Sequence, residues 1–214
     1  MRKKEIAVAL AGRPGWEGSP YAPGVRDRYG VNHPFNAKER EFSWLLHGPL
    51  PGGAQAEVFR YITRTGSSRF PTTTFRTVAT VVFPHPLPSV SARPVRNADE
   101  AWAPVSIGSG YAQTFNEGAF GPLWHGLRGY ALDPAVGRAV LCPETLDRTR
   151  SLGLDWRMDG HVAMGVVREQ RSPQRMLMLV DTLLEFASLI PPEGWESAAA
   201  QPDPWPGPSV ERPA

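Results

Sequence analysis

The chain has 214 residues, of which 41% are hydrophobic and 21% charged, and its formal net charge is +2. This length is enough to bury the core of one globular domain, and so mild a basic excess argues against a protein whose main partner is nucleic acid. The single cysteine excludes an intramolecular disulfide and any multi-cysteine zinc site, and with it we expect a cytoplasmic location.

The first segment has a basic start followed by the apolar run IAVALA at residues 6–11. A signal peptide needs an apolar run of about 7–15 residues and a small-residue cleavage site, whereas Arg13-Pro14 follows here. We therefore predict a short amphipathic helix. No run in the chain approaches the roughly 18 apolar residues of a membrane span, so we expect a soluble protein without a transmembrane segment. Residues 17–38 are rich in glycine and proline and are expected to form loops.

Three β-rich runs come next, at residues 41–48, 55–65 and 74–83. In the first of them, Phe42, Trp44 and Leu46 alternate with more polar residues, which is typical of a half-buried strand. Because only short turn-like connections separate the runs, they predict an antiparallel meander.

Three prolines, Pro84, Pro86 and Pro88, follow the third run. Proline cannot donate to a β-ladder, so we predict that the strand breaks there. Residues 90–96 would then resume as an edge strand, and residues 121–130 would form a further strand.

Two short helices are predicted after the strands. Asp133 precedes a proline, and an aspartate cap before a proline at the first helical position indicates a helix over residues 134–141. Pro143 interrupts it and opens a second helix over residues 143–152, which Gly153 closes.

The last part of the chain is predicted to contain a hairpin and a long helix. Residues 154–158 and 161–167 read as two strands, and Asp159-Gly160 between them is a strong hairpin signal. Ser172-Pro173 opens an amphipathic helix that Pro191-Pro192 ends.

These elements predict an α+β fold, with an antiparallel β-sheet in the first two thirds and then a helix–β-hairpin–helix unit packed against it. We expect one domain over residues 1–195, with mostly strands in 6–130 and the helix–hairpin–helix unit in 131–195. Residues 196–214 are dominated by proline, alanine and glycine and are predicted to be a disordered tail.

The order of several short motifs resembles a group of uncharacterised actinobacterial proteins and, distantly, the DUF3137 family. The motifs are a Phe-Asn pair, Asp-Pro-Ala, AVLCPE, Asp-Gly and a long helix ending in Ile-Pro-Pro, with Gly15-Trp16 and Leu87-Pro88 earlier. The positions matching the family pattern are Phe115, Asn116, Phe120, Asp133, Ala139, Leu141 and Pro143. The resemblance covers most of residues 6–195, but this chain lacks the membrane segment and has an irregular loop at 97–112. It implies a fold and no known activity.

Cys142 is the first candidate for chemistry. A thiol at a helix N-terminus can become a reactive thiolate, but catalysis also needs a base within hydrogen-bond reach. His161 and His125 are the candidate bases, from the segments after and before this helix. The alternative is a small side chain that packs at a helix junction, as free cysteines commonly do. The five histidines show no metal-binding spacing, so we predict no metal site and no cofactor.

Binding candidates come from the tryptophans and arginines. Trp44 and Trp124 are the weak candidates for a ligand pocket, together with Arg60 and Arg64, which share one face of a predicted strand. These two arginines could instead form a stacking platform for nucleic acid with their basic and aromatic neighbours, which are Arg69, Arg76, Tyr61, Phe70 and Phe75.

The leading hypothesis is a non-enzymatic module that binds a protein partner or a small ligand, since no complete catalytic constellation is found. One alternative is a cysteine-dependent hydrolase or transferase that uses Cys142 with His161 or His125. Another is peripheral membrane association through the N-terminal helix and the apolar face of the helix at residues 176–190. A protein partner is favoured over nucleic acid.

Overall fold

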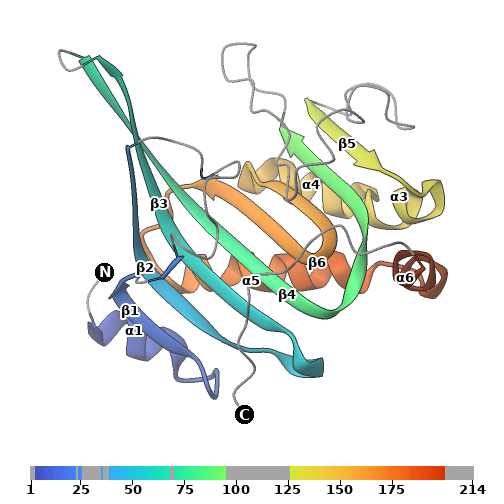
Figure 1. Ribbon diagram of the computed structural model, residues 1–214, viewed down its shortest axis with the longest axis horizontal. Coiled ribbons are helices and arrows are strands. Elements are labelled where there is room, and N and C mark those ends of the chain that lie inside the picture. Colours follow the sequence, from blue (N-terminus) through green and yellow to red (C-terminus); the bar gives the residue numbers. More distant parts are fainter. Residues whose placement is uncertain are drawn as a thin grey trace.

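The computed structural model describes residues 3–22, 24–25, 35, 39–67, 70–94 and 126–200 (Figure 1). The strands are β1 Glu17–Tyr21, β2 Glu39–Pro49, β3 Gln55–Ser67, β4 Phe70–Pro94, β5 Leu127–Ala131 and β6 Asp155–Arg168. The helices are α1 Lys3–Leu10, η1 Pro51–Gly53 (a short 3-10 turn), α3 Pro134–Val140, α4 Pro143–Leu152, α5 Pro173–Ser188 and α6 Pro192–Ala199.

The six strands form one antiparallel sheet in the order β1-β2-β3-β4-β5, with β6 paired along the other side of β4. Strand β4 holds the sheet together: its first part pairs with β3 and its last part with β5, while β6 follows it on the opposite side. The predicted meander corresponds to β2, β3 and the first part of β4. The α+β class is confirmed.

The predicted break at the three prolines is wrong, because β4 continues through them. The pairing of β4 with β6 shifts register between Val82 and Leu87 and again between Leu87 and Val90. Prolines are tolerated in strands at such irregularities, since no ladder hydrogen bond is required there. The stretch from Val90 to Pro94 pairs with β5, and Val90 to Ala92 also pair with β6. That part of β4 is central in the sheet and not an edge strand.

The predicted hairpin around Asp159-Gly160 is also a single strand, β6. Gly160 has a φ of 53°, which favours glycine, and its Cα lies opposite Leu87 in the irregular part of β4. The glycine therefore makes a bulge that bends β6 alongside β4 (Figure 1). The chain does not reverse there, because both halves of β6 find their partner on β4.

The predicted helix boundaries are largely confirmed. Asp133 caps α3, with its Oδ1 accepting a hydrogen bond from Ala135 N at 2.7 Å. Helix α4 begins at Pro143 and ends at Gly153, whose φ of 60° is the left-handed conformation expected after a helix.

Two elements were not predicted. Strand β1 lies in the segment expected to be loops, and its Pro20 is tolerated because β1 pairs on one side only. Helix α6 covers residues 196–199, the beginning of the predicted tail, and packs against β4, where the rings of Trp195 and Phe83 are 6.2 Å apart. Residues 201–214 lie outside the described residues.

The sheet is buried on both faces. Helix α5 packs its apolar side on one face, where the ring of Phe186 lies 5.0 Å from that of Trp156. On the other face, Phe35 joins an aromatic cluster with Phe42, Phe59 and Tyr61. The apolar face of α5 that could have met a membrane is therefore part of the core.

Candidate ligand-binding site

Cys142 is the N-cap residue of α4 and is half-buried. Its Sγ lies 3.4 Å from Thr145 Oγ1. The pKa of Glu144 is held below its ordinary value, first by a hydrogen bond from its own backbone N–H and second by a hydrogen bond from the Cys142 side chain. Among the described residues, the polar contacts of this thiol are with a hydroxyl and a carboxylate, and neither is a base of the kind that thiol catalysis uses.

Among the described residues, neither candidate base has a hydrogen bond to the thiol of Cys142. His161 lies on β6, where its Nδ1 is 3.0 Å from the carbonyl oxygen of Phe83 at the bend of β4. His125 lies outside the described residues. The assignment of a catalytic pair to Cys142 stays a prediction.

Two of the four binding candidates do come together. The guanidinium of Arg60 lies between the rings of Trp44 and Phe75, at 4.5 Å and 4.6 Å from their centroids. An arginine stacked on aromatic faces gains from cation–π attraction. Arg64 is exposed farther along β3, with Glu39 and Thr73 as its Cα partners, and Trp124 lies outside the described residues.

The backbone at Trp44 is unusual. Its φ of 56° lies in the left-handed region, where a bulky residue is rare, and it falls within the register shift of β2 between Ser43 and Leu46. Next to it, Ser43 Oγ and Arg60 Nε are buried without a hydrogen-bond partner among the described residues. Strain and unsatisfied polar atoms of this kind concentrate at functional sites.

Two members of the alternative stacking platform for nucleic acid, Arg60 and Tyr61, already have partners within the sheet, while Arg69 and the side chain of Phe70 lie outside the described part of the structure. Tyr61 is fully buried in the aromatic cluster, and Arg60 makes an ion pair of 2.5 Å with Glu169 Oε1. Tyr61 is therefore too buried for base stacking, and the charge of Arg60 is already paired.

Glu169 links this cluster to the start of α5. Its Oε1 pairs with Arg60, and its Oε2 accepts a hydrogen bond of 3.1 Å from Arg171 Nε. The following residue, Gln170, donates its backbone N–H to Thr77 Oγ1 at 2.8 Å. The connection between β6 and α5 is thus fixed to the sheet, while the Arg171 side chain itself remains 81% exposed.

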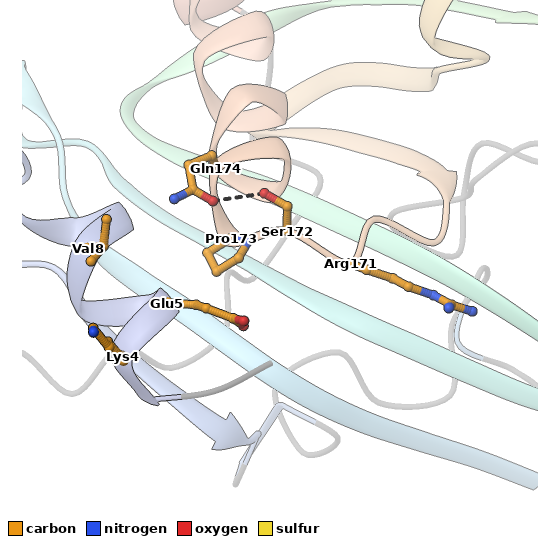
Figure 2. A pocket seen from close by; sticks show the side chains of 7 residues that line it. All are labelled: Lys4, Glu5, Val8, Arg171, Ser172, Pro173 and Gln174. Carbon is orange, nitrogen blue, oxygen red and sulfur yellow. Dashed lines mark hydrogen bonds between the residues drawn. The ribbon is translucent and has the colours of Figure 1, made fainter.

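Arg171 also lines a groove of about 470 Å³ between α1 and the start of α5 (Figure 2). The groove is formed by Lys4, Glu5 and Val8 from α1 and by Arg171, Ser172, Pro173 and Gln174 from the other side. Ser172 is the N-cap residue of α5, but its hydroxyl donates to Gln174 Oε1 at 2.8 Å and does not cap the helix. The side chain of Ser172 therefore accepts no hydrogen bond from the first backbone N–H groups of α5, which lie at the end of the helix that borders this groove.

Sequence reasoning missed the groove. Its two walls come from opposite ends of the chain, and neither wall carries a motif. The one available signal, Ser172-Pro173, predicts the start of a helix and says nothing about what faces it.

Neither a metal centre nor a membrane span is found in the part of the chain that the structure describes. There, no three His, Cys, Asp or Glu side chains gather closely enough to hold a metal ion. None of the described helices has the length and apolarity needed to cross a bilayer.

Comparison with protein-family models, with curated proteins and with solved structures finds no match for this chain. The resemblance to the DUF3137 family stays a prediction.

Proposed function

We propose that the protein is a non-enzymatic binding module, and that the groove between α1 and α5 takes a small ligand with an anionic group and an apolar body. The groove itself is the observation that supports this most. It is open to solvent, since Lys4, Glu5 and Val8 are exposed, and its volume of about 470 Å³ is large enough for a small molecule. A chain of two ion pairs connects the groove to the cluster at Trp44, because Glu169 pairs with both Arg171 and Arg60.

The ligand class follows from the lining residues. Lys4 and Arg171 both line the groove, with Glu5 as the carboxylate on the α1 side. The Arg171 guanidinium extends away from α1 (Figure 2) and pairs with Glu169, so Lys4 and the positive partial charge at the N-terminal end of α5 are the features that favour an anion. Val8, which is 62% exposed, and Pro173 supply apolar surface. A carboxylate on a short hydrocarbon chain matches both features.

The enzymatic alternative has less support, since the polar contacts of Cys142 are with Thr145 and Glu144 and the imidazole of His161 is bonded to a backbone carbonyl. The cytoplasm remains the expected compartment, because a chain with one cysteine has no internal disulfide that a reducing environment could break. The resemblance to the actinobacterial group implies no activity, so it adds nothing to the choice of ligand.

The proposal is tested by NMR titration of the ¹⁵N-labelled full chain with three probes of equal length: hexanoate, 1-hexanol and hexylamine. We expect hexanoate to shift the amide signals of Lys4, Val8 and Gln174 in a saturable way. The two other probes should bind more weakly, since hexanol lacks the charge and hexylamine carries the wrong one. If none of the three shifts these signals, the groove is not a ligand site.

The matched variants are Arg171→Gln and Arg175→Gln. Both remove one arginine at the start of α5, but only Arg171 lines the groove. We expect Arg171→Gln to weaken hexanoate binding about tenfold or less, as is usual for one exposed charge contact, and Arg175→Gln to leave it nearly unchanged. Equal effects of the two variants would indicate non-specific attraction to positive charge.

A further inference from the structure

Helix α1 forms one wall of the groove, and its attachment to the rest of the molecule is narrow. Ile6 is its one buried residue, and Ala9 and Leu10 are partly buried beside it. Every other described residue of the helix is exposed. An element with so few buried apolar contacts belongs to the part of a structure that opens most readily.

The apolar attachment depends on Gly18 of β1. A Cβ atom at this position would lie 2.4 Å from Ile6 Cγ2 and 2.8 Å from Leu46 Cδ2, closer than real atoms approach. Leu10 Cδ1 is also close, at 3.4 Å. A side chain at residue 18 would therefore force Ile6 and Leu46 to shift, which disturbs the contact between α1 and β1.

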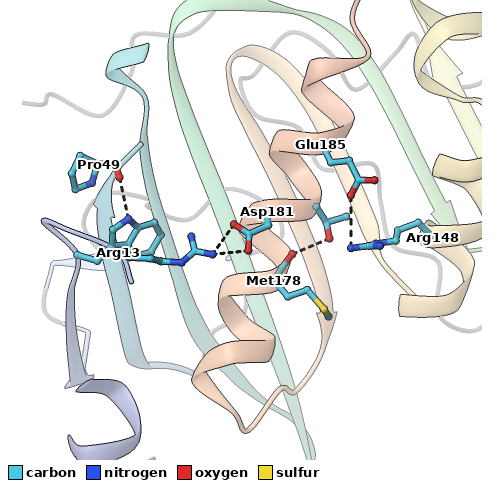
Figure 3. Close-up of polar contacts among 8 residues, drawn as sticks. Arg13, Pro49, Arg148, Met178, Asp181 and Glu185 are labelled. Atoms are coloured by element: carbon cyan, nitrogen blue, oxygen red, sulfur yellow. Dashed lines mark hydrogen bonds and ion pairs between the residues drawn. The ribbon is translucent and has the colours of Figure 1, made fainter. Parts of the chain in front are cut away.

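The second attachment is an ion pair just after the helix (Figure 3). Arg13 donates from one terminal nitrogen to both carboxylate oxygens of Asp181 on α5, at 2.7 Å and 2.5 Å. Its guanidinium also lies 5.2 Å from the ring of Trp16, whose Nε1 donates to the carbonyl oxygen of Pro49 at 3.0 Å. With Asp181 half exposed to solvent, this ion pair is of the kind that water and salt weaken.

We infer that α1 is a strap that detaches from β1 and α5 while the sheet stays folded, and that its detachment dismantles the groove. Detachment removes the wall made of Lys4, Glu5 and Val8, so a ligand binds only when α1 is docked. By linkage, a ligand that binds the docked state also holds α1 in place. The second half of this inference rests on the proposed function, whereas the first half rests on the attachment alone.

Hydrogen exchange followed by mass spectrometry on the full chain tests the first half without any ligand. We expect the amides of α1 to exchange at least about a hundredfold faster than the core amides of α5, since local opening needs less free energy than global unfolding. Gly18→Ala should speed exchange in α1 by a further tenfold or about that much and leave α5 unchanged. If α1 and α5 exchange together in the unmodified protein, α1 opens only with the whole molecule and the strap is excluded.

Two further variants keep the test decisive if Gly18→Ala fails to fold. Arg13→Gln removes the second attachment and should also speed exchange in α1. Arg148→Gln is its control, because Arg148 pairs with Glu185 on α5 at 3.7 Å and has no role in holding α1 (Figure 3). If Arg148→Gln speeds exchange in α1 as much as Arg13→Gln does, the effect comes from α5 and the inference is wrong.

Hexanoate binding tests the coupling. Hexanoate at saturation should slow exchange in α1 of the unmodified chain, by about the factor by which its concentration exceeds its dissociation constant. In Gly18→Ala or Arg13→Gln we expect the dissociation constant to rise only as far as the docked fraction of α1 falls below one. Exchange in α1 that stays unchanged when the groove is saturated with hexanoate would refute the coupling. If hexanoate does not bind the unmodified chain, both the proposed function and the coupling are refuted. The exchange rates measured without ligand then still decide whether α1 detaches.

Discussion

Trp44 shows how one residue can oppose the preference of its own backbone. A φ of 56° costs a residue with a side chain roughly 1–2 kcal/mol, yet the position holds one of the largest side chains. The compensation comes from the ring, which stacks on Arg60 at 4.5 Å and packs against the core. The side chain therefore holds its backbone in a conformation that the backbone itself disfavours.

Substitution of Trp44 separates these two contributions. Trp44→Ala and Trp44→Gly both lose the ring, but only glycine adopts a positive φ without strain. We expect the glycine variant to be more stable than the alanine variant by about 1 kcal/mol, measured by urea unfolding. At an ordinary strand position the order is reversed, so a more stable alanine variant would show that Trp44 is not strained.

A second residue-scale prediction concerns the buried pair of Arg157 and Asp159, whose side chains are 5% and 6% exposed. Ser89 Oγ also donates to Asp159 Oδ1 at 2.5 Å. Asp159→Ala removes a carboxylate that pairs with this buried guanidinium, and we expect a loss of about 3–5 kcal/mol in the free energy of unfolding.

Asp147→Ala is the control for that prediction. It removes an exposed pair with Arg150 within one turn of α4, and we expect a change below about 0.5 kcal/mol. A similar loss in the free energy of unfolding in both variants would mean that burial of Asp159 does not increase the contribution of its ion pair to stability.

At the scale of elements, β4 and β6 show where local patterns mislead. The prolines in β4 and the Asp-Gly pair in β6 are turn signals over a few residues. The prolines predict a break in the strand and the Asp-Gly pair predicts a hairpin, whereas both stretches are continuous strands. Turns and bulges both accommodate glycine at positive φ and proline without an N–H donor, so the same residues occur in either structure. Long-range pairing decides between them, because Leu87 and Gly160 are placed opposite each other across the sheet.

Gly160→Ala tests the role of this bulge. Alanine at a φ of 53° is strained, and we expect a loss of about 1–2 kcal/mol in thermal or urea unfolding. Gly12→Ala is the matched control, since a Cβ there meets nothing within 4 Å. If the two variants are equally stable, the bend of β6 does not depend on glycine.

At the scale of the whole molecule, the parts predicted well are those that short stretches determine. Asp133 and Gly153 mark helix ends through their own capping geometry, and the alternation in β2 and β3 follows from one buried face. The groove could not be predicted in this way, because Val8 and Pro173 meet only after the sheet has formed. Cys142 is a candidate nucleophile because of its residue type and its place at the start of a helix. Among the described residues, its thiol contacts Thr145 in the first turn of α4.

The central position of β4 affects how the chain can fold while it is being synthesised. β6 and α5 follow β4 in the chain and leave the ribosome after it, although β6 supplies the partner for one side of β4 and α5 covers one face of the sheet. Until they emerge, the nascent chain carries an open strand edge and a bare apolar surface, which are the features that promote intermolecular association. The edge of β4 and the apolar face beneath α5 are thus covered only after β6 and α5 have been synthesised.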